Sequence, residues 1–152
     1  MARTGWKRAL AAAAVAMGLS AALVAPAPAQ AAGLCGSGYT LVEHINQDND
    51  VSDVLEMYID IYYSSSAKRN CLVVSHAGWT YGKPMYTLAV IRPTGAAWPA
   101  CNSVGCDEGD DFKYFAGPVW TPAGVDMSHR CIDLDAEVGY NTHQELRGVH
   151  CG

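Results

Sequence analysis

Six cysteines constrain the fold of this chain more than any other feature of its sequence. They stand at Cys35, Cys71, Cys101, Cys106, Cys131 and Cys151. Their even number, and the absence of a Cys-x-x-Cys pair of the kind that holds zinc, favour three disulfides over a metal site. Disulfides persist in oxidising compartments, so we expect the protein to act outside the cytoplasm.

The first residues provide a route to such a compartment. Three basic residues within the first eight positions precede an alanine-rich apolar run, which ends before Pro26. Together with the small residues of Ala29-Gln-Ala31, this order is typical of a cleaved secretory signal peptide. We therefore predict a signal peptide at 1–31 and a single secreted β domain at 32–152. A membrane anchor is the alternative, but the run is shorter than the ~20 apolar residues that span a bilayer.

The charge left after this cleavage argues against nucleic acid as a partner. Residues 32–152 would carry seven of the ten basic residues and all fifteen acidic ones, a net charge of −8. Phosphate backbones are bound by clustered Lys and Arg, which the chain lacks. The acidic excess would instead help to keep an exported protein soluble.

The cysteine spacing predicts one disulfide and leaves the others open. Only four residues separate Cys101 from Cys106, and Asn102 and Gly105 among them favour a tight turn. Three connectivities then remain for the other four cysteines. The pairing that we favour ties down the two ends of the secreted domain, with Cys35 bonded to Cys151 and Cys71 to Cys131.

The hydrophobic pattern of residues 32–152 is that of β-strands. Within 55–63 an apolar side chain occupies every second position, which predicts a strand with one buried face and one polar face. Turn residues separate further expected strands at 39–45, 71–76, 85–92, 112–116, 119–120, 129–134 and 144–149. Residues 94–111 are predicted to form a long exposed loop. The expected fold is all-β, a small disulfide-stabilised antiparallel sandwich or barrel.

Four aromatic residues are candidate ligand-binding residues. Tyr58 and Tyr62 fall on the polar face of the strand at 55–63, Trp79 falls in a turn, and Trp98 falls in the long loop. Aromatic rings on the solvent side of a sheet can stack on sugars or anchor a partner, because they bury a large area at low entropic cost. The alternative is aromatic pairing that only stabilises the sheet.

No metal or cofactor site is predicted. The acidic runs at 48–53 and 107–111 offer oxygen ligands for calcium, but the first lacks the glycine and the terminal glutamate of the calcium-binding helix-loop-helix pattern. A solvated acidic loop is therefore the favoured interpretation. The five histidines, His44, His76, His129, His143 and His150, show no regular spacing.

No catalytic residue is predicted either. The triplet Gly36-Ser-Gly38 lacks the five-residue Gly-x-Ser-x-Gly turn of hydrolases. Ser75 and His76 are neighbours on one strand, so their side chains point to opposite faces. Asp133 and Asp135 share a face and could form a glycosidase acid–base pair, but a solvent-facing edge strand explains them more simply.

Six different short motifs follow one another along the chain: Cys35-Gly-Ser-Gly-Tyr39, Tyr62-Tyr-Ser-Ser-Ser66, Asn70-Cys-Leu-Val-Val74, Tyr114-Phe-Ala-Gly-Pro-Val-Trp120, Cys131-Ile-Asp133 and His150-Cys-Gly152. This order resembles the spore-associated protein A family, small secreted proteins of filamentous actinobacteria. The family's four cysteines correspond to Cys35, Cys71, Cys131 and Cys151. Cys101 and Cys106 look like an added pair, and the acidic segment 48–53 is a second departure.

The resemblance implies export and attachment to the spore surface, and it supplies no catalytic residue. We therefore expect a secreted structural or surface protein, not an enzyme, that contacts spore or cell-wall components and, after signal cleavage, neither nucleic acid nor membrane. Two alternatives stay open. One is a carbohydrate-binding module with Tyr58, Tyr62, Trp79 and Trp98 as its platform. The other is a small secreted hydrolase or a protease inhibitor whose reactive segment is 98–111.

Overall fold

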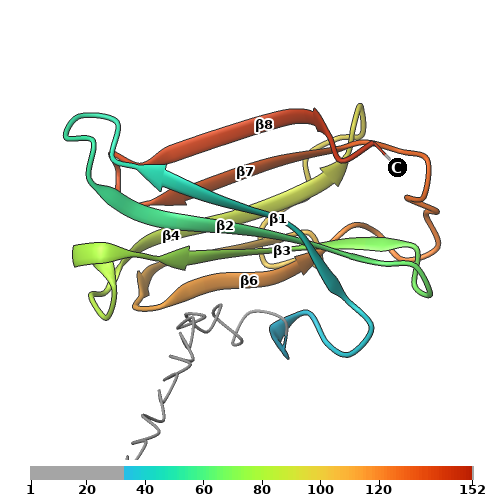
Figure 1. The fold of residues 1–152 in the computed structure, drawn as a ribbon, viewed down its shortest axis with the longest axis horizontal. Coiled ribbons are helices and arrows are strands. Elements are labelled where there is room, and N and C mark those ends of the chain that lie inside the picture. Colours follow the sequence, from blue (N-terminus) through green and yellow to red (C-terminus); the bar gives the residue numbers. More distant parts are fainter. Residues whose placement is uncertain (1–32, 152) are drawn as a thin grey trace, which may run out of the picture.

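The computed structural model describes residues 33–151, which form two four-stranded antiparallel sheets packed as a sandwich (Figure 1). Sheet A has the strand order β1-β2-β3-β6 and sheet B the order β5-β4-β7-β8. The strands are β1 (Thr40–Asp48), β2 (Leu55–Ser64), β3 (Arg69–His76), β4 (Met85–Pro93), β5 (Cys106–Phe112), β6 (Phe115–Trp120), β7 (Ile132–Val138) and β8 (His143–Val149), with one 3-10 turn, η1 (Gly78–Thr80). The all-β prediction is confirmed, and of its two forms the sandwich is the one observed. The predicted signal peptide lies outside the described residues.

The core lies between the two sheets and follows from the period-two pattern of the strands. Met57, Ile59 and Ile61 on β2 point inward and are fully buried. They meet Leu134 and Ala136 from β7 of the opposite sheet within one hydrophobic cluster. Alternate residues of a strand point to opposite faces, so the same alternation that buries these side chains sends Tyr58 and Asp60 to the outer face of sheet A.

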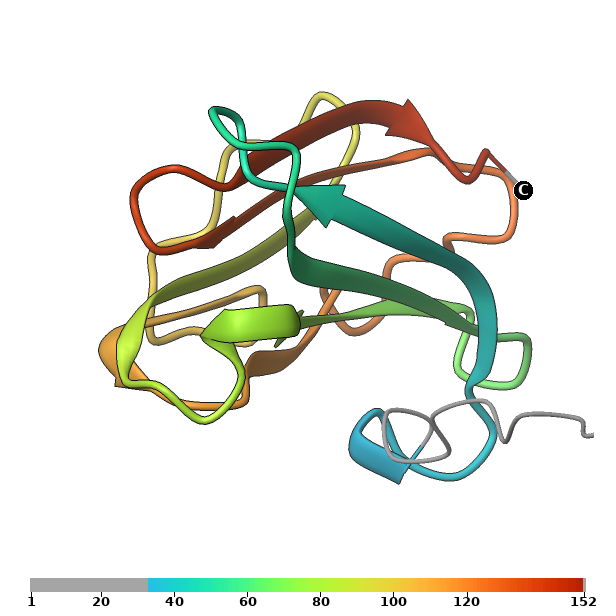
Figure 2. The same ribbon diagram turned by 60° about the vertical axis from the view of Figure 1, so that its left-hand side comes forward.

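The edge strands β1 and β8, one from each sheet, lie on the same side of the sandwich in both ribbon views (Figures 1 and 2). His150, just after β8, contacts Glu43 of β1 through an ion pair between Nε2 and Oε2. The two sheets are therefore joined at this side by side-chain contacts as well as by the core.

Strand β2 is more buried than its alternating pattern predicts. Tyr62 is 2% exposed and Asp60 is 4% exposed, although both lie on the outer face. Tyr62 is covered by the segment 33–39, which packs Leu34 and Tyr39 against Tyr62 and Val73, and Asp60 contacts His44 of β1. Burial, followed by the nearby Asp60 carboxylate, raises the pKa of Tyr62 to about 12.

The predicted Cys101–Cys106 bridge is confirmed, whereas the favoured pairing of the other cysteines is wrong. Cys35 bonds to Cys71, and Cys131 bonds to Cys151. Each bridge joins segments that the fold already brings together. Cys71 lies on β3 beneath the covering segment 33–39, while Cys131 and Cys151 flank the paired residues Ile132 and Val149 of β7 and β8.

The prediction of a loop throughout 94–111 is wrong in its last part, because Cys106–Phe112 forms strand β5 at the edge of sheet B. Its acidic residues and Gly109 disfavour a strand on their own. Backbone pairing with β4 overrides that preference, since an edge strand can keep its carboxylates in water. The expected strand at 129–134 likewise begins later, at Ile132, after the loop that carries Cys131.

Candidate functional site

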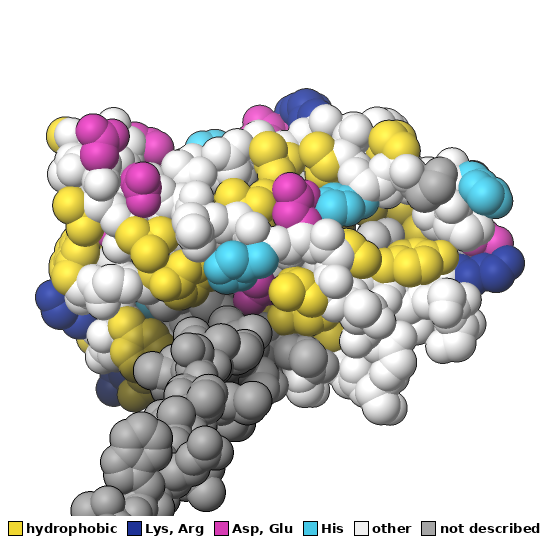
Figure 3. All heavy atoms as spheres, viewed as in Figure 1, with side chains coloured by type: hydrophobic (Ala, Val, Ile, Leu, Met, Phe, Trp, Pro, Cys, Tyr) yellow, Lys and Arg dark blue, Asp and Glu magenta, His cyan; other side chains and the backbone are white. Residues whose placement is uncertain are grey.

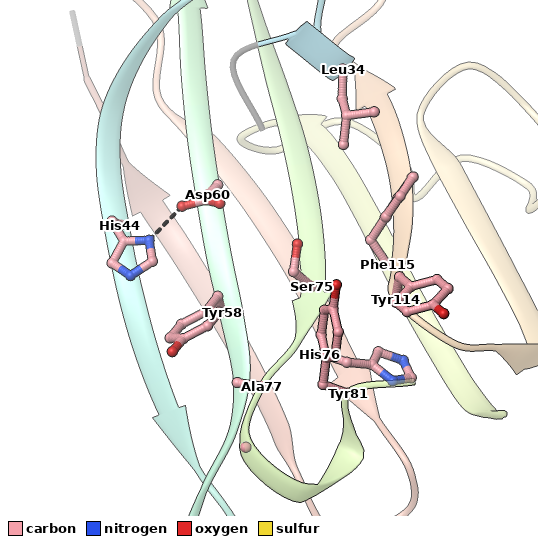
Figure 4. A pocket seen from close by; sticks show the side chains of 11 residues that line it. Leu34, His44, Tyr58, Asp60, Ser75, His76, Ala77, Tyr81, Tyr114 and Phe115 are labelled. Carbon is pink, nitrogen blue, oxygen red and sulfur yellow. Dashed lines mark hydrogen bonds and ion pairs between the residues drawn. The ribbon is translucent and has the colours of Figure 1, made fainter. Parts of the chain in front are cut away.

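The outer face of sheet A carries a groove of about 570 Å³, which we call the outer groove (Figure 4). Its principal lining residues are Leu34, His44, Tyr58, Asp60, Ser75, Tyr81, Tyr114 and Phe115. It is the part of the face that the segment 33–39 leaves uncovered, with Leu34 of that segment at one end. Its size falls within the roughly 300–1,000 Å³ of small-molecule sites.

Sheet pairing explains how residues from distant parts of the chain meet here. Tyr58 on β2 lies opposite Ser75 on β3, and Ser75 lies opposite Phe115 on β6. Figure 4 shows Tyr58 on one side of Ser75, with Tyr114 and Phe115 on the other. The loop after η1 adds Tyr81, whose ring meets the ring of Tyr114 edge-on, with 5.1 Å between centroids.

The aromatic walls are open to solvent. Tyr81 is 61% exposed, Tyr114 49% and Phe115 36%. Contiguous exposed apolar surface on a small protein marks an interaction site more often than isolated exposed residues do. The outer groove is therefore the strongest candidate for ligand binding among the described residues.

A histidine–aspartate pair lies in the groove beside these aromatics. His44 Nδ1 is 2.6 Å from Asp60 Oδ1, and the His44 side chain is 34% exposed while that of Asp60 is 6% exposed. The other ring nitrogen of His44 is 3.1 Å from Asn46 Oδ1. The ring of Tyr58 packs against that of His44, with 5.1 Å between centroids. The His44 ring is thus held by contacts with Asp60, Asn46 and Tyr58.

His76 also borders the groove, but its ring is directed into the core. Its Nδ1 lies 3.1 Å from the Thr80 carbonyl and its Nε2 lies 2.7 Å from Thr87 Oγ1 on sheet B. Because a carbonyl only accepts, Nδ1 carries the proton and the neutral Nε2 accepts from the Thr87 hydroxyl. Burial holds the pKa of His76 below its ordinary value, against the opposing effect of the Thr80 carbonyl.

The charge around the groove is acidic or neutral. Figure 3 views the molecule from the same side as Figure 1, and on that view acidic and histidine side chains lie among hydrophobic ones, while Lys and Arg appear towards the rim. No Lys or Arg is among the described residues that line the groove. Ligands with dense negative charge are disfavoured by this distribution.

The four aromatic residues predicted to form one platform are not brought together. Tyr58 lines the outer groove, but Tyr62 is buried beneath the segment 33–39. Trp79 is 48% exposed, donates its indole N–H to Glu56, and has Lys83 Nζ 4.4 Å from its ring centroid. Trp98 packs instead against the guanidinium of Arg92 on sheet B, at 3.7 Å.

Sequence reasoning missed most of the groove. Tyr81, Tyr114, Phe115, His44 and Asp60 were not among the predicted binding residues. The alternation along β2 placed Asp60 on the same face as Tyr58, and this was the one usable indication. Nothing in the residue order showed that β6 pairs with β3 or that the loop after η1 folds against Tyr114.

The described residues do not form the catalytic arrangements considered from the sequence. A hydrolytic triad needs the histidine next to the nucleophile, yet His44 Nε2 faces Asn46 and not a serine hydroxyl. Asp133 is 2% exposed and accepts hydrogen bonds from Thr94, Gly148 and Arg92. Burial would raise its pKa, but these bonds outweigh burial and hold the pKa below its ordinary value. A general acid needs the opposite shift.

The disulfide loop does not have the form of a protease-inhibiting segment. A peptide that binds beside a strand of its partner must be extended. Here backbone pairing between Ser103 and Cys106 closes a tight turn. The carbonyls of Val104 and Gly105 accept hydrogen bonds from the backbone N–H groups of Trp120 and Ile91. The inhibitor alternative therefore finds no support in this geometry.

Within residues 33–151, no group of three or more His, Cys, Asp or Glu side chains is placed to hold a metal ion. The acidic residues of 48–53 and 107–111 lie on separate segments: the first run spans the end of β1 and the loop after it, and the second lies on strand β5. In the same described part of the chain, no helix is long and apolar enough to cross a membrane.

Comparison with known proteins supports the resemblance noted in the sequence. The chain is 29% identical over 133 residues to spore-associated protein A of Streptomyces coelicolor, an alignment that covers 86% of this chain and 73% of the relative. No model of a known protein family matches the chain. No solved structure matches it either. The resemblance to spore-associated protein A, inferred from short motifs, is thus confirmed over most of the chain.

Proposed function

We propose that this protein is an exported, non-catalytic protein of the spore or cell-envelope surface and that it attaches through the outer groove. The observation that carries the proposal is the cluster of exposed aromatic side chains, Tyr81, Tyr114 and Phe115, around a groove that lacks an assembled nucleophile. The name of the similar Streptomyces coelicolor protein, which speaks of spore association, supports the location.

The framework suits a protein that works outside the cell. All six cysteines are paired within a chain whose strands form a single sandwich core. Small domains bury a limited share of their surface, so cross-links add stability that the core alone does not supply. A cross-linked β-sandwich is a durable scaffold for presenting a binding surface.

The hydrogen bonds of the polar side chains support a non-catalytic role. The polar side chains that a hydrolase would use have no nucleophile among their partners: His44 contacts Asp60 and Asn46, and Asp133 contacts Arg92 and Thr94. The hydroxyl of Ser75 has no hydrogen bond to another described residue, and Ser75 lies beside Tyr58, not beside a base. Binding requires only the exposed rings and polar groups of the groove.

Retention on intact spores tests the proposal. The full-length gene is expressed in a secreting host, and the oxidised protein recovered from the medium is incubated with Streptomyces coelicolor spores, washed and quantified. We expect saturable retention that falls by about tenfold in the Tyr81→Ala/Tyr114→Ala double variant, because two exposed rings are lost. Tyr140, which is 81% exposed and packs against Tyr86 of sheet B, provides the matched control Tyr140→Ala.

Equal retention of the Tyr81/Tyr114 double variant and the Tyr140 variant would overturn the groove as the attachment site. Failure of the wild-type protein to bind spores at all would overturn the proposed location. Thermal unfolding of each variant, measured in parallel, separates loss of binding from loss of folding.

A further inference from the structure

We infer that the outer groove binds a sugar unit of a neutral polysaccharide, with Tyr58 and Tyr114 as its apolar walls and Asp60 as its hydrogen-bond acceptor. This inference rests on the proposed function, because it names the class of ligand for the same groove. The shape of the groove, its unpaired polar atoms and its charge support the inference.

The walls fit the apolar faces of a pyranose ring. Tyr58 stands on β2, whereas Tyr114 and Phe115 stand across Ser75 at the other side of the groove (Figure 4). Both sides therefore offer ring faces or edges, while the Ser75 hydroxyl lies between them and Asp60 lies beside Tyr58 on β2. Sugars present C–H groups on their faces and hydroxyls around their edges, so they match an arrangement of apolar walls and a polar floor.

The polar floor has hydrogen-bonding capacity to spare. Asp60 is 4% exposed, and its Oδ1 accepts from His44. Its second carboxylate oxygen has no hydrogen-bond donor within residues 33–151, nor has the hydroxyl of Ser75 a partner there. Neither atom is among the buried side-chain atoms that lack a partner, so both are open to the groove, where hydroxyl groups of a sugar can bond to them in place of solvent.

His44 prepares Asp60 for this role. The 2.6 Å contact with His44 of β1 fixes one carboxylate oxygen of Asp60. The packing of Tyr58 against the His44 ring fixes that ring in turn. Ligand binding then loses little conformational entropy in ordering the Asp60 carboxylate, which is the usual benefit of a preorganised site. His44 is accordingly a positioning residue, and Asp60 is the residue that contacts the sugar.

Other ligand classes fit the groove less well. Phosphate-rich polymers need cations, but no Lys or Arg lines the groove among the described residues. Extended peptides bind by adding a strand to a sheet edge, whereas the groove lies on a sheet face whose backbone is already paired with β1, β3 and β6. A neutral glycan needs neither free cations nor a free edge.

Titration calorimetry with defined soluble polymers tests this assignment. The oxidised protein is titrated with chito-oligosaccharides and cello-oligosaccharides as neutral probes and with poly(glycerol phosphate) as the anionic probe. We expect saturable binding of at least one neutral probe. Asp60→Asn, which keeps the shape but removes the charged acceptor, should weaken binding by roughly tenfold or more. Tyr58→Ala should do likewise, whereas Tyr58→Phe, which keeps the ring, should bind within about threefold of wild type.

Tyr140→Ala again serves as the control, since it removes an exposed ring from the other sheet. Binding of the phosphate polymer alone, no binding of any probe, or neutral-glycan binding that Asp60→Asn and Tyr58→Ala leave unchanged would overturn the inference. Spore retention without glycan binding would overturn the inference but leave the proposed function standing. Glycan binding without spore retention would overturn the proposed function but leave the assignment of the ligand class standing.

Discussion

His76 and Thr87 join the two sheets through a buried hydrogen bond, with 2.7 Å between Nε2 of the imidazole and Oγ1 of the hydroxyl. His76 lies on β3 of sheet A and Thr87 on β4 of sheet B, and the exposed fractions are 2% and 0%. The imidazole is held neutral there, because burial lowers its pKa. A polar contact in the core thereby becomes sensitive to acid.

His76 should make the fold less stable as the pH falls below its unfolded pKa. Its folded pKa is lowered, so its contribution to stability is complete above about pH 6.5 and is lost as the pH falls from there towards the folded pKa. Urea unfolding between about pH 8 and about pH 5 measures this dependence. The His76→Gln variant should lack this part of the decline, whereas exposed His129→Gln should retain it. The same slope in both variants would contradict the assignment.

Glu56→Gln should destabilise the protein by roughly 2–4 kcal/mol at neutral pH. Glu56 is 4% exposed and accepts from Thr142 Oγ1 at 2.6 Å, from Asn49 Nδ2 at 3.0 Å and from the Trp79 indole. An amide offers one acceptor oxygen to these three donors and turns an N–H towards one of them. Chemical denaturation measures the loss, with the exposed Asp111→Asn as the control.

The contribution of the Glu56 carboxylate to the free energy of unfolding should disappear in acid. Burial would raise the pKa of Glu56, but the bonds from Thr142, Asn49 and Trp79 outweigh it and the pKa is lowered. Its contribution is therefore present above the ordinary carboxyl pKa and is lost as the pH falls through the lower folded value. Wild type and Glu56→Gln should converge in stability in that acid range. A constant difference between them would count against the network.

Replacement of Cys35 and Cys71 by Ser should cost more stability than replacement of the other pairs. The bridge closes the longest loop, with a sequence separation of 36 against 20 for Cys131–Cys151 and 5 for Cys101–Cys106. The chain-entropy relation gives roughly 4, 3 and 2 kcal/mol, respectively. Denaturant midpoints of the three double variants test the order. The Cys35/Cys71 variant should also expose Tyr62, since the segment 33–39 loses its link to β3.

Trp98→Ala should leave spore retention unchanged. The ring packs against Arg92 and lies 6.0 Å from the Arg147 guanidinium, on sheet B and away from the outer groove. Loss of the cation–π contact should lower stability by about 0.5–1 kcal/mol. A thermal scan and the retention assay measure the two effects. A strong loss of retention would restore Trp98 as a binding residue.

The strands could be predicted from the sequence where local pattern and packing agree. In β2 the alternation of Met57, Ile59 and Ile61 with polar residues matches the sandwich core. In β5 the acidic sequence disfavours a strand, and only pairing with β4 makes one. Sheet order depends on contacts between distant segments, for which a single sequence carries no direct sign.

The same limit applies to the disulfides and to the groove. The Cys101–Cys106 bridge is local and could be predicted, whereas Cys35–Cys71 depends on the path of the segment 33–39 across sheet A. That path buries Tyr62 and leaves Tyr58 open, so two tyrosines of one strand face come to differ in role. Alternation alone treats them alike.

Hydroxyl-radical footprinting of spore-bound protein tests most directly that the outer groove is the attachment site. Tyr81 and Tyr114 are 61% and 49% exposed, and Tyr140 is 81% exposed on the opposite side of the sandwich, so all three are accessible to the radical in the free protein. Binding through the groove should protect Tyr81 and Tyr114 and leave Tyr140 as reactive as before. Protection of Tyr140 with Tyr81 and Tyr114 unchanged would contradict the account.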